Sequence, residues 1–550
     1  MRIIRSEWLR AFLIGASVFV WVCGLRVLDV TRVRWLLVGD TAQSYLAWEF
    51  FRKTPLLQWP LGNNPEFGKG FASSIVFTDS IPLLALILKP ITKLTTNDFQ
   101  YFGWWLLGCF ILQVFFAFKV MTLMRVSQVM QIIAAPLFAL QPALLDRMTF
   151  DSYGHMALSA HWLILAAIWL FLRPRTTHLA WAVLLVISIG VTFYFFVIAF
   201  GILLMWSAQR VSTNANKKKM LMHDTLKLGF VLATCFAFVA ALGGLQSGGL
   251  QDTGLGMYRA TLTSLIDSSS MTGQTWSTLL SPLDLPGKFG DHEGFGYLGI
   301  GSLLLVLVAV VIGLLKHPRL FHQSYWLAAL GVLFFILALS PKVAIANREL
   351  YAYPIPGFIE DALSIVRATG RFIWLPMYLI TFAAIALLAS SLERKRHAAL
   401  AIILILVTLQ IADTWRAINE TRERFTQSQF FFITDSQLWD DLARGRQHLV
   451  SIPPLSNDSR WIDLALLAHR FDMSTTASYV SRKDEIAFQQ VLLDSQTALE
   501  RRDFKPDTLY VVTNYPPNPE APKLFSEQRA GLLPGIRVVQ QEELTVIVRD

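Results

Sequence analysis

Repeated apolar runs of membrane length constrain this chain more than any other feature of its sequence. Runs of about 18–20 residues, separated by short polar breaks, are what helices that cross a bilayer require. Of the 550 residues, 54% are hydrophobic and only 16% are charged. We therefore expect an α-helical polytopic membrane protein. About eleven transmembrane helices are predicted, at residues 11–28, 99–118, 128–145, 156–172, 178–191, 194–208, 226–244, 297–315, 324–340, 372–390 and 398–414.

Charge predicts the orientation of these helices. The formal net charge is +9, and the basic residues gather in short connections between apolar runs. That is the positive-inside pattern of membrane proteins, and it does not indicate nucleic-acid binding. It places the N-terminus in the cytoplasm and the C-terminus outside. The count of eleven spans assumes that residues 81–91, which are too few to cross the bilayer, lie on the membrane or dip into it. It also assumes that residues 178–208 form two short spans.

With this orientation, every long connection lies on the outer face. These connections are residues 31–97, 146–155, the turn around 192–194, 245–296 and 341–371. The N-terminus has a basic start and a long apolar run without a small-residue cleavage site, so we expect a retained anchor and not a cleaved signal. The working surface is therefore expected outside the membrane.

The last part of the chain has a different pattern. After a membrane domain at 1–414, we expect a small extracytoplasmic α/β domain at 415–550. Strands are predicted at 448–452, 508–512, 536–539 and 544–548, and helices at 460–471 and 484–500. No Gly-rich phosphate loop occurs in this domain, which argues against a nucleotide-binding role.

Asp40 is the sharpest catalytic candidate of the first outer loop. It follows Gly39 just outside the first span and precedes a predicted helix over 41–52. Its carboxylate could act as a general base on an acceptor hydroxyl, or it could simply cap the helix. Tyr45 and Trp48 have the spacing of a helix lying in the headgroup plane. They are candidates for substrate contact, with a plain membrane anchor as the alternative.

Asp79 is a second acid of the same loop, in the sequence Phe77-Thr78-Asp79-Ser80-Ile81-Pro82. It could cap the following helix, or it could share a site with Asp40 as a paired catalytic carboxylate or a metal ligand. Hard cations prefer such oxygen ligands. No cofactor is required by the sequence, and a divalent cation remains open.

Other outer turns carry polar candidates for substrate binding. Asp151 and His155 lie where one span ends and the next begins, and ionisable groups at membrane depth favour a functional hypothesis. His292 lies in a Pro- and Gly-containing segment at 281–296, which could be a lid over the site or an ordinary solvated loop.

Arg367 and Arg371 lie four residues apart on the outer approach to a span. If this segment is helical, the two side chains face one way. Guanidinium groups suit bidentate phosphate recognition, so both are candidates for binding the phosphate of a lipid donor. Snorkelling toward lipid headgroups is the alternative.

Taken together, these motifs resemble the GT-C superfamily of integral-membrane glycosyltransferases, within it a bacterial branch of large envelope proteins. The resemblance covers roughly residues 1–414. It is carried by Gly39-Asp40, Trp59-Pro60-Leu61-Gly62-Asn63-Asn64-Pro65, Phe77–Pro82, His155 and Gly370-Arg371-Phe372.

The resemblance implies transfer of a sugar from a polyprenyl-phosphate donor to a glycan or lipid acceptor, in the bacterial inner membrane. It gives Asp40 the role of base, and Arg367 and Arg371 that of phosphate contacts. The first loop lacks the Asp-x-Asp or paired acids of metal-dependent members, which puts a metal requirement in doubt. A non-catalytic protein that binds or moves a lipid-linked glycan is the rival hypothesis.

Overall fold

Helices form at each of the apolar runs. The computed structural model describes residues 2–71, 74–93, 95, 97–148, 154–246, 255–270, 275–283, 290–316, 325–426, 437–455, 460–513, 518–541 and 543–550. Within that part of the chain, six helical stretches are long and apolar enough to cross a membrane. They are Phe102–Leu123, Gln128–Asp146, Phe193–Thr213, Lys217–Leu242, Thr369–Ser391 and Glu393–Thr426.

The remaining predicted spans are shorter or more charged helices, so the count of eleven stays a prediction. Four are apolar but short: Met156–Leu172, His178–Val191, Ile300–Ile312 and Tyr325–Leu339. The helix at Arg2–Val22 has four charged residues in its first half. The run at 81–91, predicted to be too short to cross, forms the 11-residue helix α3, Pro82–Thr92.

The chain divides into two compact units, each described by itself. The first unit contains residues 1–29, 101–237 and 250–427, and it holds most of the apolar helices. Its α-helices are α1 Arg2–Val22, α4 Phe102–Leu123, α5 Gln128–Ala134, α6 Pro136–Ala139, α7 Pro142–Asp146, α8 Trp162–Leu172, α9 His178–Val191, α10 Phe193–Thr213, α11 Lys217–Leu242, α12 Ile300–Lys316, α13 Tyr325–Leu339, α14 Gly357–Ser364, α15 Trp374–Ser391 and α16 Arg396–Thr426.

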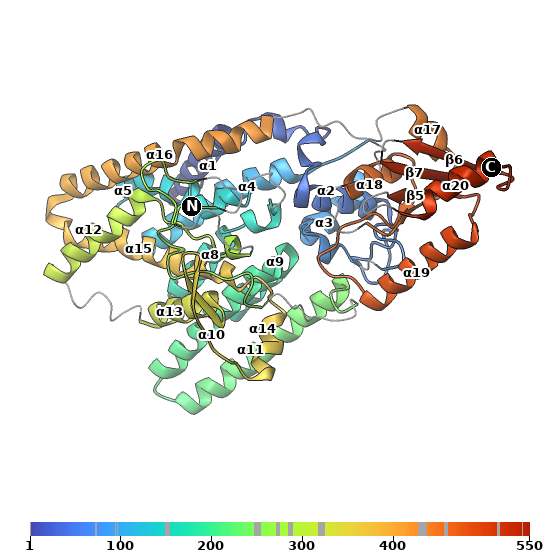
Figure 1. Ribbon diagram of the computed structural model, residues 1–550. Helices are drawn as coiled ribbons and strands as arrows, with labels where there is room; N and C mark the ends of the chain where they lie inside the picture. The colour runs from blue at the N-terminus through green and yellow to red at the C-terminus, as the bar shows by residue number, and fades with distance from the viewer. Residues whose placement is uncertain are drawn as a thin grey trace. The chain divides into compact units, whose positions relative to one another are not determined.

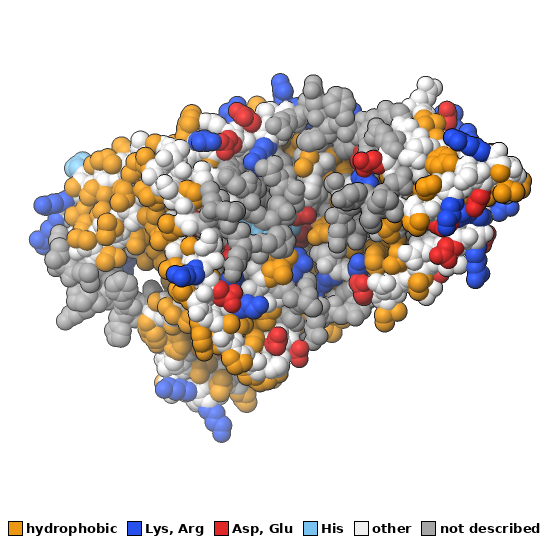
Figure 2. All heavy atoms as spheres, viewed as in Figure 1, with side chains coloured by type: hydrophobic (Ala, Val, Ile, Leu, Met, Phe, Trp, Pro, Cys, Tyr) orange, Lys and Arg blue, Asp and Glu red, His pale blue; other side chains and the backbone are white. Residues whose placement is uncertain are grey.

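Helix-on-helix packing builds the first unit. Helix α4 packs against α1 and α8, while α12 packs against α15 and α16. Short 3-10 turns connect the helices, and β1 and β2 form an antiparallel hairpin. Their bounds are η1 Arg26–Leu28, η4 Met156–Ser159, η5 Asp291–Gly294, η7 Thr369–Ile373, η8 Glu393–Lys395, β1 Lys342–Ile345 and β2 Arg348–Ala352. Hydrophobic side chains such as Leu307 and Ile405 stay exposed on this unit, as expected of helices that face lipid. Figure 2 shows many hydrophobic side chains on the surface.

The second unit joins the first outer loop to the tail. It contains residues 30–100, 238–249 and 428–550, so the loop and the tail share one core. Its elements are η2 Arg34–Leu36, α2 Gly39–Lys53, η3 Ile75–Thr78, α3 Pro82–Thr92, α17 Gln437–Ala443, α18 Arg460–Arg470, α19 Glu485–Arg501, α20 Glu520–Arg529, β3 His448–Ile452, β4 Ser474–Thr475, β5 Thr508–Thr513, β6 Ile536–Gln541 and β7 Leu544–Arg549. The predicted boundary at 414 falls inside α16, which runs on to Thr426.

A five-stranded mixed sheet forms the centre of the second unit (Figure 1). The strand order is β4-β3-β5-β7-β6, with β3 parallel to β4 and β5, and β7 antiparallel to β5 and β6. All six residues of β5 are buried, as a central strand requires. Leu499 of α19 and Leu524 of α20 pack with Tyr510 and Val512 of β5 in one hydrophobic cluster.

The first outer loop covers the short edge strand β4. The N–H groups of Gly68 and Lys69 donate to the carbonyl of Thr475 at 3.0 and 2.8 Å, and the N–H of Thr475 donates to the carbonyl of Glu66 at 2.9 Å. An uncovered edge would offer unpaired backbone groups to other chains. Phe67 reinforces this edge, because its ring packs against the rings of Phe50 and Trp461, 5.5 and 6.1 Å away.

Replacing Phe67 by Ala should therefore loosen the tail, although Phe67 lies in the first loop. The ring is buried, and truncation of a buried Phe costs about 3–5 kcal/mol. Limited proteolysis of the purified protein should show faster cleavage of the tail. Leu57→Ala is the matched control, since Leu57 lies in the same loop and is 95% exposed. Equal cleavage rates for the two variants would contradict the shared core.

Candidate functional site

Three buried charges meet at turns between the helices of the first unit. Glu293 of η5 accepts a hydrogen bond from Nη1 of Arg147 at 2.8 Å, and from Nε and Nη2 of Arg371 at 2.8 and 2.6 Å. Arg147, directly after α7, also donates to the carbonyl of His292 at 3.2 Å. All three charged side chains are less than a tenth exposed. One carboxylate therefore compensates two arginines inside the protein.

Glycines make this approach possible. A Cβ atom at Gly370 would lie 2.7 Å from the Cα of Gly294, and a Cβ at Gly294 would lie 2.3 Å from the Cα of Ala260. No side chain fits at those distances, so glycine at 370 lets η7 pack directly on η5, and glycine at 294 lets η5 pack directly on the backbone of Ala260. The N–H of Gly370 donates to the carbonyl of Tyr258 at 2.9 Å and anchors the turn.

Aromatic rings lie under the guanidinium groups. The guanidinium carbon of Arg371 lies 4.2 Å from the ring centre of Tyr194, that of Arg367 lies 4.7 Å from the ring centre of Tyr258, and that of Arg147 lies 5.4 Å from Trp374. Such cation–π contacts stabilise the cations where water is scarce. The arginines are thereby held in place before any ligand arrives.

The charges also set the ionisation of the neighbouring groups. Burial disfavours the charged form of Glu293, but Arg371 and Arg147 outweigh it and hold the pKa of Glu293 well below its usual value. Burial lowers the pKa of His292 to about 4. The negative charge of Glu293 raises this pKa, whereas the positive charges of Arg147, Arg371 and His155 lower it further. His292 is therefore neutral at pH 7, and the part of 281–296 around it is packed and not a solvated loop.

The two arginines predicted to bind phosphate differ in the structure. Arg371 is buried with Nε and Nη2 on Glu293. Arg367 is only partly buried, with its guanidinium group on Tyr258. Arg367 is the more accessible of the two, and phosphate binding by either stays a prediction. His155 is half-buried at the start of η4, whereas Asp151 lies outside the described residues.

Asp40 and Asp79 lie in the second unit. Val38 occupies the N-cap position of α2, and Asp40 lies in the first helical turn, half-buried. The alternative of a simple helix cap therefore does not hold for Asp40, although a carboxylate in the first turn still suits the helix dipole. Ser80, next to Asp79, donates to the carbonyl of Ser44 at 2.8 Å, which holds this turn against the first half of α2.

Helix α2 is a core helix and not the predicted surface helix. Every residue from Thr41 to Arg52 is buried, including Tyr45 and Trp48. The indole N–H of Trp48 donates to the carbonyl of Phe99 at 2.8 Å. Aromatic residues at helical spacing suggested the headgroup plane, but here they pack inside the second unit, where α2 contacts α3 and α18.

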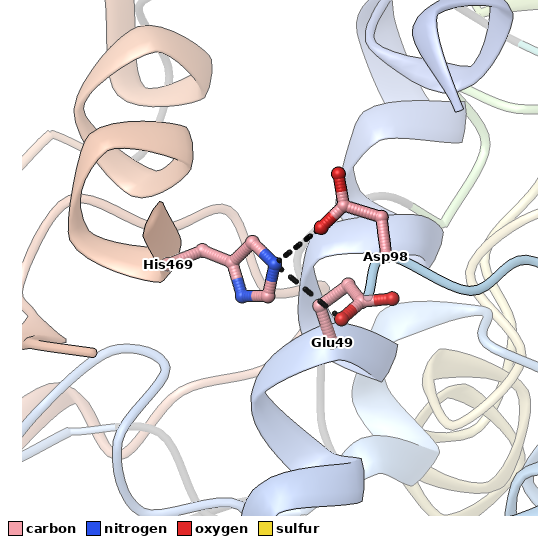
Figure 3. A group of neighbouring side chains, drawn as sticks. All are labelled: Glu49, Asp98 and His469. Carbon is pink, nitrogen blue, oxygen red and sulfur yellow. Dashed lines mark hydrogen bonds and ion pairs between the residues drawn. The ribbon is translucent and has the colours of Figure 1, made fainter. Parts of the chain in front are cut away.

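A second buried polar cluster lies in this unit, and sequence reasoning missed it. Nε2 of His469, on α18, lies 3.1 Å from Oδ1 of Asp98 and 3.4 Å from Oε2 of Glu49, on α2 (Figure 3). Nε of Arg52 donates to the same Glu49 oxygen at 2.7 Å, and the N–H of Phe99 donates to Oε1 at 2.9 Å. Three segments far apart in the sequence thus converge on one point.

The same cluster perturbs both acids. Burial raises the pKa of Glu49, although His469 and Arg52 oppose this. The hydrogen bond from His469 lowers the pKa of Asp98. Nothing in the sequence pairs residue 469 with the first loop. The one available signal was Glu49 itself, an acid amid aromatic residues three positions before Arg52.

Comparison with known proteins gives a family and distant structural likenesses. The family model described as "Domain of unknown function (DUF6311)" matches residues 12–415, and "DUF6311 C-terminal domain" matches residues 438–539. No curated protein matches the sequence.

Two solved structures from Archaeoglobus fulgidus are similar. The oligosaccharyltransferase in its apo form is 12% identical in sequence, with a TM-score of 0.41. The match covers 86% of this chain and 64% of the oligosaccharyltransferase, which is less than two thirds of its length. The oligosaccharyltransferase AglB in complex with an inhibitory peptide and a dolichol-phosphate is 11% identical in sequence, with a TM-score of 0.42. The match covers 99% of this chain and 74% of the AglB chain. A likeness at this level carries no inference about activity.

Replacing Glu293 by Gln should destabilise the first unit by about 3–5 kcal/mol, because it leaves two buried arginines without their carboxylate. Thermal unfolding of the purified protein in detergent measures the loss. Glu420→Gln is the control: Glu420 pairs with Arg416 at an i,i+4 spacing on the surface, which is worth about 0.3–0.5 kcal/mol. Similar losses in both variants would contradict the compensating role of Glu293.

The pH dependence of stability should also differ between the wild-type protein and the Glu293→Gln variant. A pKa held below its unfolded value of about 4.3 gives stability that is present above that pH and is lost as the pH falls through the folded pKa. Wild type should lose stability on acidification below about pH 4 more steeply than Glu293→Gln. Parallel pH curves would contradict the lowered pKa.

Proposed function

We propose that this chain, which belongs to the DUF6311 family, is a membrane glycosyltransferase. It would move a sugar from a polyprenyl-phosphate donor to an envelope glycan or lipid acceptor at the outer face of the bacterial inner membrane. The observation that carries this proposal is the position of Asp40. It is a half-buried carboxylate in the first turn of α2, whose residues Thr41–Arg52 are all buried, and the N-cap position is held by Val38 instead.

A rigid, partly accessible carboxylate suits a general base. Asp40 would take the proton of the acceptor hydroxyl while the hydroxyl oxygen attacks the anomeric carbon. The new bond forms as the bond from that carbon to the donor phosphate oxygen breaks, and the lipid phosphate leaves with the bonding electrons. A single displacement inverts the configuration. Asp79, held beside the same end of α2, is a second acid that could pass the proton on.

Arginine supports the departure of the phosphate. Negative charge builds on the leaving oxygen, and a fixed guanidinium group stabilises it. Arg367 would make this contact, because its side chain is partly exposed and its guanidinium group is oriented by Tyr258. Arg371 would not contact the phosphate directly. Its ion pair with Glu293 would hold in place the turn that follows Arg367, and so position Arg367. His155 and His292, which are close enough for their charges to interact, would contact donor oxygens.

Asp40→Asn should lower sugar transfer by about 10²–10⁴-fold, the usual contribution of general base catalysis. Transfer is measured with purified protein, radiolabelled polyprenyl-phosphate sugars and membrane extract as acceptor. Asp29→Asn, at an exposed aspartate close by in the sequence, should leave the rate unchanged. Transfer at the wild-type rate by Asp40→Asn would exclude Asp40 as base. Binding of the donor without any transfer by wild type would favour the non-catalytic rival.

Arg367→Gln should weaken donor binding more than tenfold, since hydrogen bonds to charged groups contribute about 1.5–3 kcal/mol. The Michaelis constant for the donor and direct binding of the lipid phosphate both report it. Arg348→Gln removes an exposed arginine of β2 and controls for general attraction to anionic lipid. If the two variants bind the donor equally well, Arg367 has only the snorkelling role.

A further inference from the structure

One histidine nitrogen faces two carboxylates in the second unit. Nε2 of His469 points at both Asp98 and Glu49 (Figure 3). A single ring N–H can serve only one carboxylate well, yet both oxygens lie within 3.4 Å of it. Burial makes this costly: Glu49 is completely buried and His469 is only 7% exposed. The arrangement favours a positive centre between the three groups.

The spacing fits a divalent metal ion. The three ligand atoms all lie within 4.8 Å of one another. A tetrahedral zinc ion with bonds of about 2.0–2.2 Å holds its ligand atoms roughly 3.3–3.6 Å apart. Nε2 of His469 lies 3.1 and 3.4 Å from the two carboxylate oxygens, within a few tenths of an ångström of these values, and the two oxygens lie within 4.8 Å of each other. Small rotations of the partly exposed Asp98 side chain would complete the geometry.

The surroundings also suit an ion at this point. Nε of Arg52 and the N–H of Phe99 hydrogen-bond the two oxygens of Glu49 and hold its carboxylate in place, as outer groups do around metal ligands. Arg52 also donates to the carbonyls of Thr92 and Asn97, at 3.3 and 2.5 Å. Two carboxylates supply oxygen ligands for the ion, and Asp98, 47% exposed, leaves an open side for water.

We propose that Glu49, Asp98 and His469 bind a divalent transition-metal ion, zinc in preference to magnesium because one ligand is an imidazole, with water completing the coordination. The ion would join α2, the segment before α4, and α18, and so fasten the first outer loop to the tail. Metal binding of this kind contributes to folding directly. The proposal is independent of sugar transfer, so that either can fail alone.

Zinc chloride is the probe. The full-length protein, stripped with a chelator, should take up one zinc per chain in calorimetric titration, and its unfolding temperature should rise with zinc concentration. Cobalt should give the visible absorption of a tetrahedral site. Asp98→Asn and His469→Gln should each weaken zinc binding by more than about 100-fold, the upper end of the effect of outer groups.

Asp472→Asn is the matched control. Asp472 pairs with Lys53 beside the cluster but is 80% exposed and contributes no ligand, so zinc affinity should be unchanged. If His469→Gln fails to fold, the zinc affinity of Asp98→Asn is the deciding measurement. This variant is expected to fold, because the asparagine side chain has the shape of the aspartate and is partly exposed. No zinc uptake by wild type would overturn the proposal, with the cluster being an ion-pair network only. Uptake that persists in Asp98→Asn would overturn it equally, since the zinc would bind elsewhere.

Discussion

The buried carboxylate of Glu293 is the contact on which the outer end of the first unit depends. Removing three ions from water costs several kcal/mol for each ion. The cost is offset here because Glu293 accepts from both Arg147 and Arg371 at hydrogen-bonding distance. The turn after α7, η5 and η7 are thereby joined, and Gly370 and Gly294 allow their backbones to approach closely. Arg147 and Arg371 are both positioned by this one carboxylate.

Backbone pairing between the first loop and the tail organises the second unit, which also holds the buried polar cluster of Glu49, Arg52 and His469. A strand of two residues, β4, could not hold the edge of a sheet alone. Pairing with residues 66–69 extends it, and the rings of Phe50, Phe67 and Trp461 seal the join. The first loop is therefore part of the tail's architecture. If that loop carries the base Asp40, the tail acts as the support that keeps the base rigid.

Much of the local structure could be predicted from the sequence, because it depends on short-range patterns. Short runs rich in β-branched and apolar residues predicted β3 at residues 448–452 and located β5, β6 and β7. Helical periodicity located α18 and α19 to within a residue or two. The short strand β4 has too few residues to show a pattern, and α20 has little apolar periodicity.

Long-range partners could not be predicted in the same way. Helix α2 has aromatic residues at the spacing of a surface anchor, and only α18, more than 400 residues later, turns that face into a core. Glu293 looked like one acid among several in a loop, since neither Arg147 nor Arg371 is near it in sequence. For Asp40, the local pattern suggested a cap, and the backbone around Val38 placed the cap two residues earlier.

The pairing of loop and tail has a consequence for biosynthesis. Asp98 and His469 are 371 residues apart in the chain. At synthesis rates of about 5–20 residues per second, roughly 20–75 s pass between the emergence of the two segments. Throughout that interval Phe67 and the backbone at 66–69 lack Trp461 and Thr475, the partners that the tail supplies. The loop is therefore synthesised long before the tail with which it folds. The yield of intact protein then depends on what protects the exposed loop from aggregation and proteolysis during this interval.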